Sequence, residues 1–252
     1  MNANTLILIA LGLLGWLVGM LINYLADILP IKRRLGKPIC AACFDPMPPG
    51  INYWLWPRRC PECRSRRSWR TWAVEIFYLA ALPWLWLKFD EPLHFIFGAI
   101  LLAYFGLVFV VDMEHRLILH STSIFGAVLG AIIGVYLHGL WLTLLGGAVG
   151  FGSMYFLYWF GDVFARWLAR RRGETLTEVA LGFGDVNLAG VLGLLLGWPG
   201  IVGGLLLAII LGGVGSFIYV LFALLFRRYH TFMAIPYGPF LVISAVMLLY
   251  VL

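Results

Sequence analysis

The sequence predicts an all-α polytopic membrane protein with about eight transmembrane helices and a cytoplasmic zinc-ribbon loop between the first two. The chain has 252 residues, of which 62% are hydrophobic and 12% are charged, and a soluble globular domain is far less apolar. Most of its apolar runs approach the ~20 residues that a helix needs to cross ~30 Å of hydrocarbon. All four cysteines fall within one polar segment, which indicates a single dedicated site.

The apolar runs set the order of the expected helices. They lie at about 5–29, 72–87, 93–111, 117–138, 140–160, 179–198, 201–226 and 232–252. We therefore divide the chain into a first transmembrane helix at 1–29, a cytoplasmic zinc-binding loop at 30–71, and a transmembrane catalytic bundle of about seven helices at 72–252.

The basic residues predict how these helices are oriented. Of the 18 Lys and Arg residues, 17 fall in the segments 30–71, 112–116, 161–178 and 227–231. Cytoplasmic loops carry the excess of positive charge, so we expect these four segments inside and both termini outside. This distribution accounts for the net charge of +6. Because no basic arm is left over, nucleic acid is not an expected partner, and the lipid bilayer is.

The four cysteines form two knuckles, Cys40-Ala-Ala-Cys43 and Cys60-Pro-Glu-Cys63. This pattern is typical of a zinc ribbon, in which four thiolates coordinate one Zn²⁺ tetrahedrally. Thiols stay reduced in the cytoplasm, which favours metal over disulfides. Four cysteine ligands leave no open position for water, so we assign the zinc a structural role, as a staple for a loop whose own core is small.

Two carboxylates stand at the ends of apolar runs. Asp112 closes the run at 93–111, and Asp185 lies in the stretch Leu181-Gly-Phe-Gly-Asp-Val-Asn187. The predicted topology puts both on the cytoplasmic side at similar depth, so we expect them to meet. Gly182 and Gly184 would allow a broken helix start there and leave room for an extended peptide backbone.

Two carboxylates that share a water predict the chemistry of an aspartic protease, because one keeps a proton and the other takes one from the water. We hypothesise that Asp185, near a helix N-terminus, is the general base and that Asp112 retains the proton. A proton or cation pathway and a purely structural hydrogen-bonded pair are the competing interpretations.

Three other acidic residues lie close to the expected helices. Asp27 is expected to form an interfacial ion pair with the basic segment 32–34, and Asp162 is expected to be solvated or paired in a basic loop. Glu75 lies about one turn inside the second helix. It could pair with Arg70 or with a loop arginine, or it could border the site of the two aspartates.

These residues together resemble the type IV prepilin peptidases, the GxGD class of intramembrane aspartyl proteases. The resemblance runs nearly end to end. It rests on Gly19–Asn23 closing at Leu29-Pro30, the paired cysteine knuckles, Val74-Glu75, Asp112, the Gly182-Phe-Gly-Asp185 motif, and Pro236–Phe240. The chain departs from the family's usual pattern at Asn187, where the family usually has lysine.

The resemblance implies cleavage of short basic leader peptides from prepilins and pseudopilins at the cytoplasmic face of a prokaryotic plasma membrane. Many family members then methylate the new N-terminus, so S-adenosylmethionine is a candidate second cofactor beside Zn²⁺. Pilus or type II secretion assembly machinery is the implied partner. The alternatives are an ion-coupled transporter, which should pair Asp112 or Asp185 with an intramembrane Lys or Arg, and a protease-dead pilin assembly factor.

Overall fold

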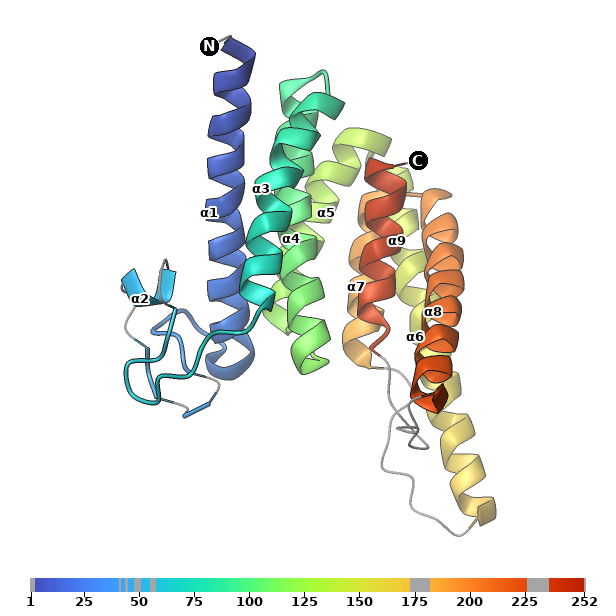
Figure 1. Cartoon of the computed structure of the whole chain (residues 1–252). Coiled ribbons are helices and arrows are strands. Elements are labelled where there is room, and N and C mark those ends of the chain that lie inside the picture. Colours follow the sequence, from blue (N-terminus) through green and yellow to red (C-terminus); the bar gives the residue numbers. More distant parts are fainter. Residues whose placement is uncertain are drawn as a thin grey trace. The chain divides into compact units, whose positions relative to one another are not determined.

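The computed structural model of the chain describes residues 3–40, 42–43, 45–47, 51–54, 58–172, 182–225 and 236–251. Its helices are α1 (Ala3–Lys32), α2 (Ile51–Trp54), α3 (Arg70–Lys88), α4 (Pro92–His115), α5 (His120–His138), α6 (Leu140–Arg172), α7 (Phe183–Leu196), α8 (Gly200–Leu225) and α9 (Gly238–Tyr250). They divide into two compact units, Met1–Val111 and Asp112–Leu252, and Figure 1 labels each helix.

The predicted all-α fold is confirmed, since every one of the eight apolar runs contains a helix. Five helices in the described part are long and apolar enough to cross a membrane, namely α1, α4, α5, α6 and α8. Helices α7 and α9 are apolar but have only 14 and 13 residues. The 179–181 part of the sixth run lies outside the described residues.

The first unit is built on the packing of α1 against α3, which run side by side in Figure 1. Two glycines of α1 make this possible. A Cβ added to Gly15 would lie 2.1 Å from the carbonyl oxygen of Tyr78, and one added to Gly19 would lie 2.8 Å from the Cα of Glu75. Close backbone approach at small residues is how helices associate in lipid, where burial of apolar side chains provides no drive.

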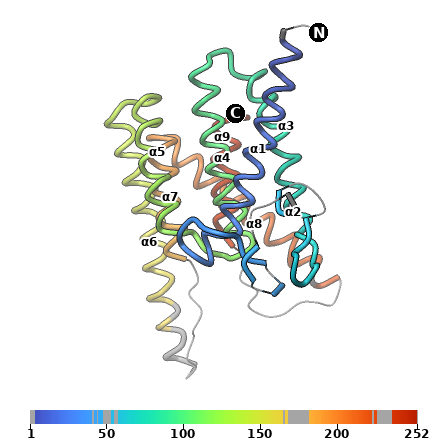
Figure 2. Tube along the Cα trace, turned by 90° about the vertical axis from the view of Figure 1, so that its left-hand side faces the viewer, coloured from blue at the N-terminus to red at the C-terminus, as the bar shows by residue number. Residues whose placement is uncertain are grey.

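The second unit is centred on α7. This helix packs against α5, α6, α8 and α9, and Figure 2 shows α6 and α7 alongside one another. Its residues from Val186 to Leu196 are mostly buried. A helix that is apolar on all sides is stable only where other helices surround it. The α5–α6 and α7–α8 connections are tight: Gly139 and Gly197 have positive φ angles of 80° and 63°, a conformation that suits glycine.

The structure corrects one boundary. The segment after residue 160 was expected to be a loop, but α6 continues as a helix to Arg172. Aromatic side chains one turn apart stack along it, including Phe156 with Phe160 and Phe160 with Phe164, and Asp162 pairs with Arg166 at the i,i+4 spacing. These contacts are local to the helix, so it does not need apolar surroundings to continue.

We expect Gly146→Ala to destabilise the second unit. A Cβ on Gly146 would lie 2.3 Å from the carbonyl oxygen of Gly193 on α7, and backbone cannot yield as a side chain can, so overpacking should cost about 1–3 kcal/mol. Gly152→Ala, on the same helix, is the matched control: nothing lies within 4 Å of its added Cβ. Thermal unfolding in detergent measures both, and equal midpoints for the two variants would contradict the close approach.

Candidate active site and metal centre

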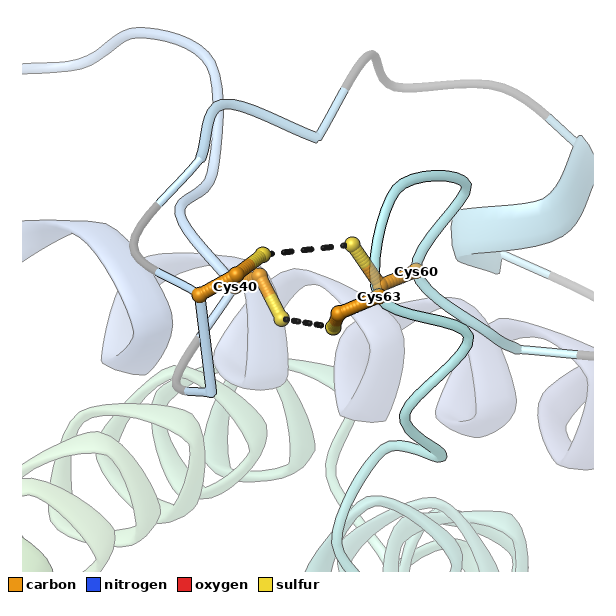
Figure 3. A group of neighbouring side chains, drawn as sticks. Cys40, Cys60 and Cys63 are labelled. Atoms are coloured by element: carbon orange, nitrogen blue, oxygen red, sulfur yellow. Dashed lines mark hydrogen bonds between the residues drawn. The ribbon is translucent and has the colours of Figure 1, made fainter.

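The four cysteines of the predicted zinc site converge. Their sulfur atoms all lie within 4.8 Å of one another, and Figure 3 shows thiols of the two knuckles facing each other. The Sγ atoms of Cys40 and Cys63 are 3.6 Å apart, as are those of Cys43 and Cys60. A tetrahedral Zn²⁺ with ~2.3 Å bonds to sulfur needs about 3.8 Å between its ligands. The donor set therefore fits one metal ion, and none of the four is in a disulfide.

Each knuckle is a short hairpin closed by backbone hydrogen bonds. The Cys40 N–H donates to Asp45 O at 3.0 Å, and the Cys60 N–H donates to Ser65 O at 3.0 Å. Burial would raise the pKa of the Cys40 thiol, but backbone hydrogen bonds from Cys43 and Ala42 outweigh it and lower the pKa below its usual value. A thiolate is the form that coordinates a metal.

The second knuckle has an arginine on each side of its base, and both arginines reach helices α1 and α3 of the first unit. Arg58 and Arg67 are joined across the hairpin by Arg67 N–H donating to Arg58 O at 3.1 Å. Arg67 pairs with Asp27 on α1, whereas Arg58 pairs with Glu75 on α3. The metal-binding loop is thus fastened to both helices by the same short hairpin.

Asp27 forms the expected ion pair, but with different partners. Both Arg67 and Arg70 donate to its carboxylate, whereas the prediction was the basic segment 32–34. Tyr53 also donates to Asp27 Oδ2 at 2.8 Å, and its ring lies under the Arg67 guanidinium at 4.1 Å. Burial and the Asp27 charge both raise the pKa of Tyr53, so its hydroxyl stays a donor at neutral pH.

Glu75 pairs with a loop arginine, one of the outcomes expected from its position. Arg58 Nη2 lies 2.7 Å from Glu75 Oε2, and both side chains are at least 95% buried. Trp16 Nε1 donates to the same oxygen at 2.8 Å, and Asn23 Nδ2 lies 3.5 Å from Oε1. The Arg58 guanidinium also stacks over Trp72 at 4.2 Å. A carboxylate this buried needs such partners.

Glu75→Gln is expected to destabilise the first unit by about 3–5 kcal/mol, because it removes one carboxylate of a buried ion pair. Glu91→Gln is the control. Glu91 is paired with His94 at 3.1 Å, but its side chain is 67% exposed, and exposed pairs contribute about 0–1 kcal/mol. The measurement is the thermal unfolding midpoint in detergent. A Glu75→Gln midpoint as high as that of the control would mean that the buried pair contributes nothing.

Asp112 lies in the last turn of α4 and is 4% exposed. Its Oδ2 has no hydrogen-bond partner among the described residues. Buried carboxylate oxygens are normally satisfied, so an orphan oxygen calls for an explanation such as a ligand, water or substrate group. Within the described part of the chain, neither Asp112 nor Asp185 forms an ion pair with Lys or Arg, which is what a transporter with a charge-paired carboxylate would need.

Asp185 lies in the first turn of α7, where the helix dipole favours a negative charge. Gly182 is the N-cap of this helix, with extended backbone, and the Asp185 N–H donates to Gly182 O at 3.1 Å. Gly184 has a packing reason to be glycine, since a Cβ there would lie 2.8 Å from the Cβ of Ile118. Gly182 is exposed, and a Cβ there would lie 3.4 Å from Asp185 Oδ2 and 4.0 Å from the Gly184 backbone nitrogen.

Gly238, the first residue of α9, lies against both aspartates. A Cβ added to it would lie 2.4 Å from Asp112 Oδ2 and 3.4 Å from Asp185 Oδ1. The two carboxylates therefore converge on one point in the second unit, formed by the ends of α4, α7 and α9. Sequence reasoning noted the segment Pro236–Phe240 but not this contact. A glycine between two prolines at the start of an apolar helix was the available signal.

Fold and site together define a class: a polytopic helical membrane protein with one buried and one half-buried carboxylate at its helix ends and a cluster of four cysteines that could hold a metal ion. Comparison with known proteins narrows the class. The family model described as the type IV leader peptidase family matches residues 95–217, which include both aspartates. No solved structure gives a significant match.

Two curated relatives bear the name prepilin leader peptidase/N-methyltransferase. The protein from Pectobacterium carotovorum subsp. carotovorum is 28% identical, over 94% of this chain and 90% of its own length. The one from Aeromonas hydrophila is 28% identical, over 85% of this chain and 71% of its own length. The match to the family model and the names of these relatives both support the family predicted from the motifs.

Proposed function

We propose that the protein is an intramembrane aspartic endopeptidase that removes leader peptides from prepilins and pseudopilins, with Asp112 and Asp185 as its catalytic pair. The observation that carries the proposal is the convergence of the two carboxylates on Gly238. The match to the family model and the names of the relatives supply the substrate class.

The chemistry follows from two carboxyl groups that share one proton, because like charges this close do not both ionise cheaply. The ionised carboxylate takes a proton from a water whose oxygen attacks the scissile carbonyl carbon. The protonated carboxyl gives its proton to the carbonyl oxygen, which forms a neutral tetrahedral diol. Collapse of the diol breaks the C–N bond: the departing amine takes a proton from one carboxyl group, and a diol hydroxyl gives its proton to the other, so the pair again holds one proton.

The short length of α7 supports a site below the membrane surface. In the proposed topology, eight helices cross the membrane, and the turn at Gly197–Gly200 lies on the outer side. From that turn back to Asp185, α7 rises about 18 Å at 1.5 Å per residue. The hydrocarbon is ~30 Å thick, so Asp185 would lie roughly 10 Å inside the cytoplasmic boundary. A substrate whose apolar stem stays in the bilayer presents a peptide bond at such a depth.

The four cysteines would hold a structural Zn²⁺, which fits a donor set of four thiolates with no open position. Within this proposal Gly182 and Gly184 shape the start of α7. Glu75 acts by holding the Arg58 hairpin, and a role at the border of the site stays a prediction. Methyl transfer is supported only by the relatives' names, and we assign no described residue to S-adenosylmethionine.

The test is cleavage of a prepilin in proteoliposomes that contain the full-length protein, with the masses of both products measured. A leader peptide and a mature chain with a free N-terminus are the expected products. An added methyl mass when S-adenosylmethionine is supplied would establish the second activity. An intact substrate after prolonged incubation with folded, metal-loaded protein would overturn the peptidase proposal, provided that the same prepilin is cleaved by a known prepilin peptidase in parallel.

A further inference from the structure

The amino end of α9 forms a third side of the candidate site. Gly238 is the first residue of the helix and Pro239 follows it. The first N–H groups of a helix have no partner inside it, and they point the positive end of the helix dipole outwards. Because proline has no N–H, Gly238 carries the only backbone donor of the first two helical positions.

The space available at this position, and not its backbone conformation, requires a residue without a side chain. Gly238 is not among the residues with positive φ, so other residues could adopt its backbone without strain. It is buried, however, and the place where its Cβ would stand is 2.4 Å from Asp112 Oδ2. That oxygen is the one that has no hydrogen-bond partner among the described residues.

The atom that a Cβ on Gly238 would meet, Asp112 Oδ2, is at the end of a side chain. At Gly146 an added methyl group would meet backbone, which must move as a whole. At Gly238 it would meet the carboxyl group of Asp112, which can turn about its side-chain torsions. A methyl group at Gly238 is therefore expected to displace a carboxylate more readily than to disrupt the packing of the helix.

We propose that Gly238 is a positioning residue of the peptidase site: its lack of a side chain holds open the place of Asp112 Oδ2 beside Asp185. This inference rests on the proposed function of the two aspartates. Through it the start of α9 sets the geometry in which the pair shares its proton. A displacement of about 1 Å in such a group can reduce a rate by about 100-fold.

The test is Gly238→Ala in the full-length protein, assayed on a prepilin in proteoliposomes beside Gly213→Ala. The control adds the same methyl group to α8, where nothing lies within 4 Å. We expect kcat of Gly238→Ala to fall about 100-fold, with KM and the unfolding midpoint close to those of the control. A kcat within twofold of the control overturns the proposal. A loss of activity matched by a fall in the midpoint that Asp112→Ala does not relieve also overturns it, because that result indicates a packing role.

A double variant keeps the test informative if Gly238→Ala does not fold. The conflict is with the Asp112 carboxyl group, so Gly238→Ala combined with Asp112→Ala should fold as well as Asp112→Ala alone. A double variant that is also unfolded would place the conflict elsewhere and refute the inference. Failure of the proposed function is a separate result, since it would appear as cleavage by Asp112→Asn whatever the behaviour of Gly238→Ala.

Discussion

Asp112→Asn and Asp185→Asn are each expected to lower prepilin cleavage by at least about 1,000-fold, within the range that positioned acid–base groups contribute. Neither amide can take a proton from water, and neither can complete the exchange that the pair requires. In the proposed mechanism the two carboxyl groups act as one unit, so the double variant should be no worse than the worse single variant. Initial cleavage rates in proteoliposomes, compared over the same range of protein concentration, measure the effect.

The same variants also distinguish catalysis from structure. A charged carboxylate is costly to keep inside a membrane, whereas an amide carries no charge. Neither substitution should therefore lower the unfolding midpoint. Asp162→Asn serves as the control. It removes a carboxylate of α6 that pairs with Arg166 near the end of its helix, and cleavage should be unchanged. Retained cleavage in either catalytic variant, or a midpoint several degrees below wild type, would favour the structural-pair interpretation.

The elements that could be predicted are those that follow from local pattern. The apolar runs predicted where the helices lie, and the cysteine spacing predicted the four-cysteine cluster. Both depend on residues that are near each other in sequence. The meeting of Asp112 with Asp185 was inferred from alternation of the helices across the membrane. That argument fixes a side and a depth but no distance, so the convergence of both carboxylates on Gly238 came from the structure.

Contacts between distant segments were not predictable in the same way. The partners of Asp27 were expected in the neighbouring segment 32–34, yet the arginines that reach it come from the far side of the metal loop. The two knuckles bring that hairpin back to α1, and sequence spacing does not reveal this path. Gly238 was missed for a related reason, since the need for a glycine lies in the Asp112 side chain more than a hundred residues away.

Cys60→Ser is expected to remove the bound metal and to release the loop from the helices of the first unit. Cys60 is buried and lies in the hairpin between Arg58 and Arg67, which hold Glu75 and Asp27. Structural zinc contributes about 10–16 kcal/mol of binding free energy in small domains, and hydroxyl is a poor substitute for a thiolate ligand. Without the metal, the hairpin is held by its two ion pairs, by its backbone hydrogen bonds and by the contacts of Arg58 with Trp72 and of Arg67 with Tyr53.

Two measurements on purified protein detect the loss of metal and the release of the loop. Metal analysis should find about one zinc per wild-type chain, as one tetrahedral four-cysteine site requires, and none in Cys60→Ser. Limited digestion with trypsin should cut the exposed arginines of the hairpin, Arg59, Arg64 and Arg66, about ten times faster in the variant, because protease cleavage follows the population of the opened loop.

The matched control is Glu62→Ala, which changes an exposed residue between Cys60 and Cys63 and removes no ligand. It should keep its zinc and its resistance to trypsin. Wild-type resistance in zinc-free Cys60→Ser would show that Arg58 and Arg67 hold the loop unaided, and the metal would then have no structural role. Slow digestion restored by Zn²⁺ in chelator-treated wild type, but not in Cys60→Ser, would tie the order of the loop to the four thiolates.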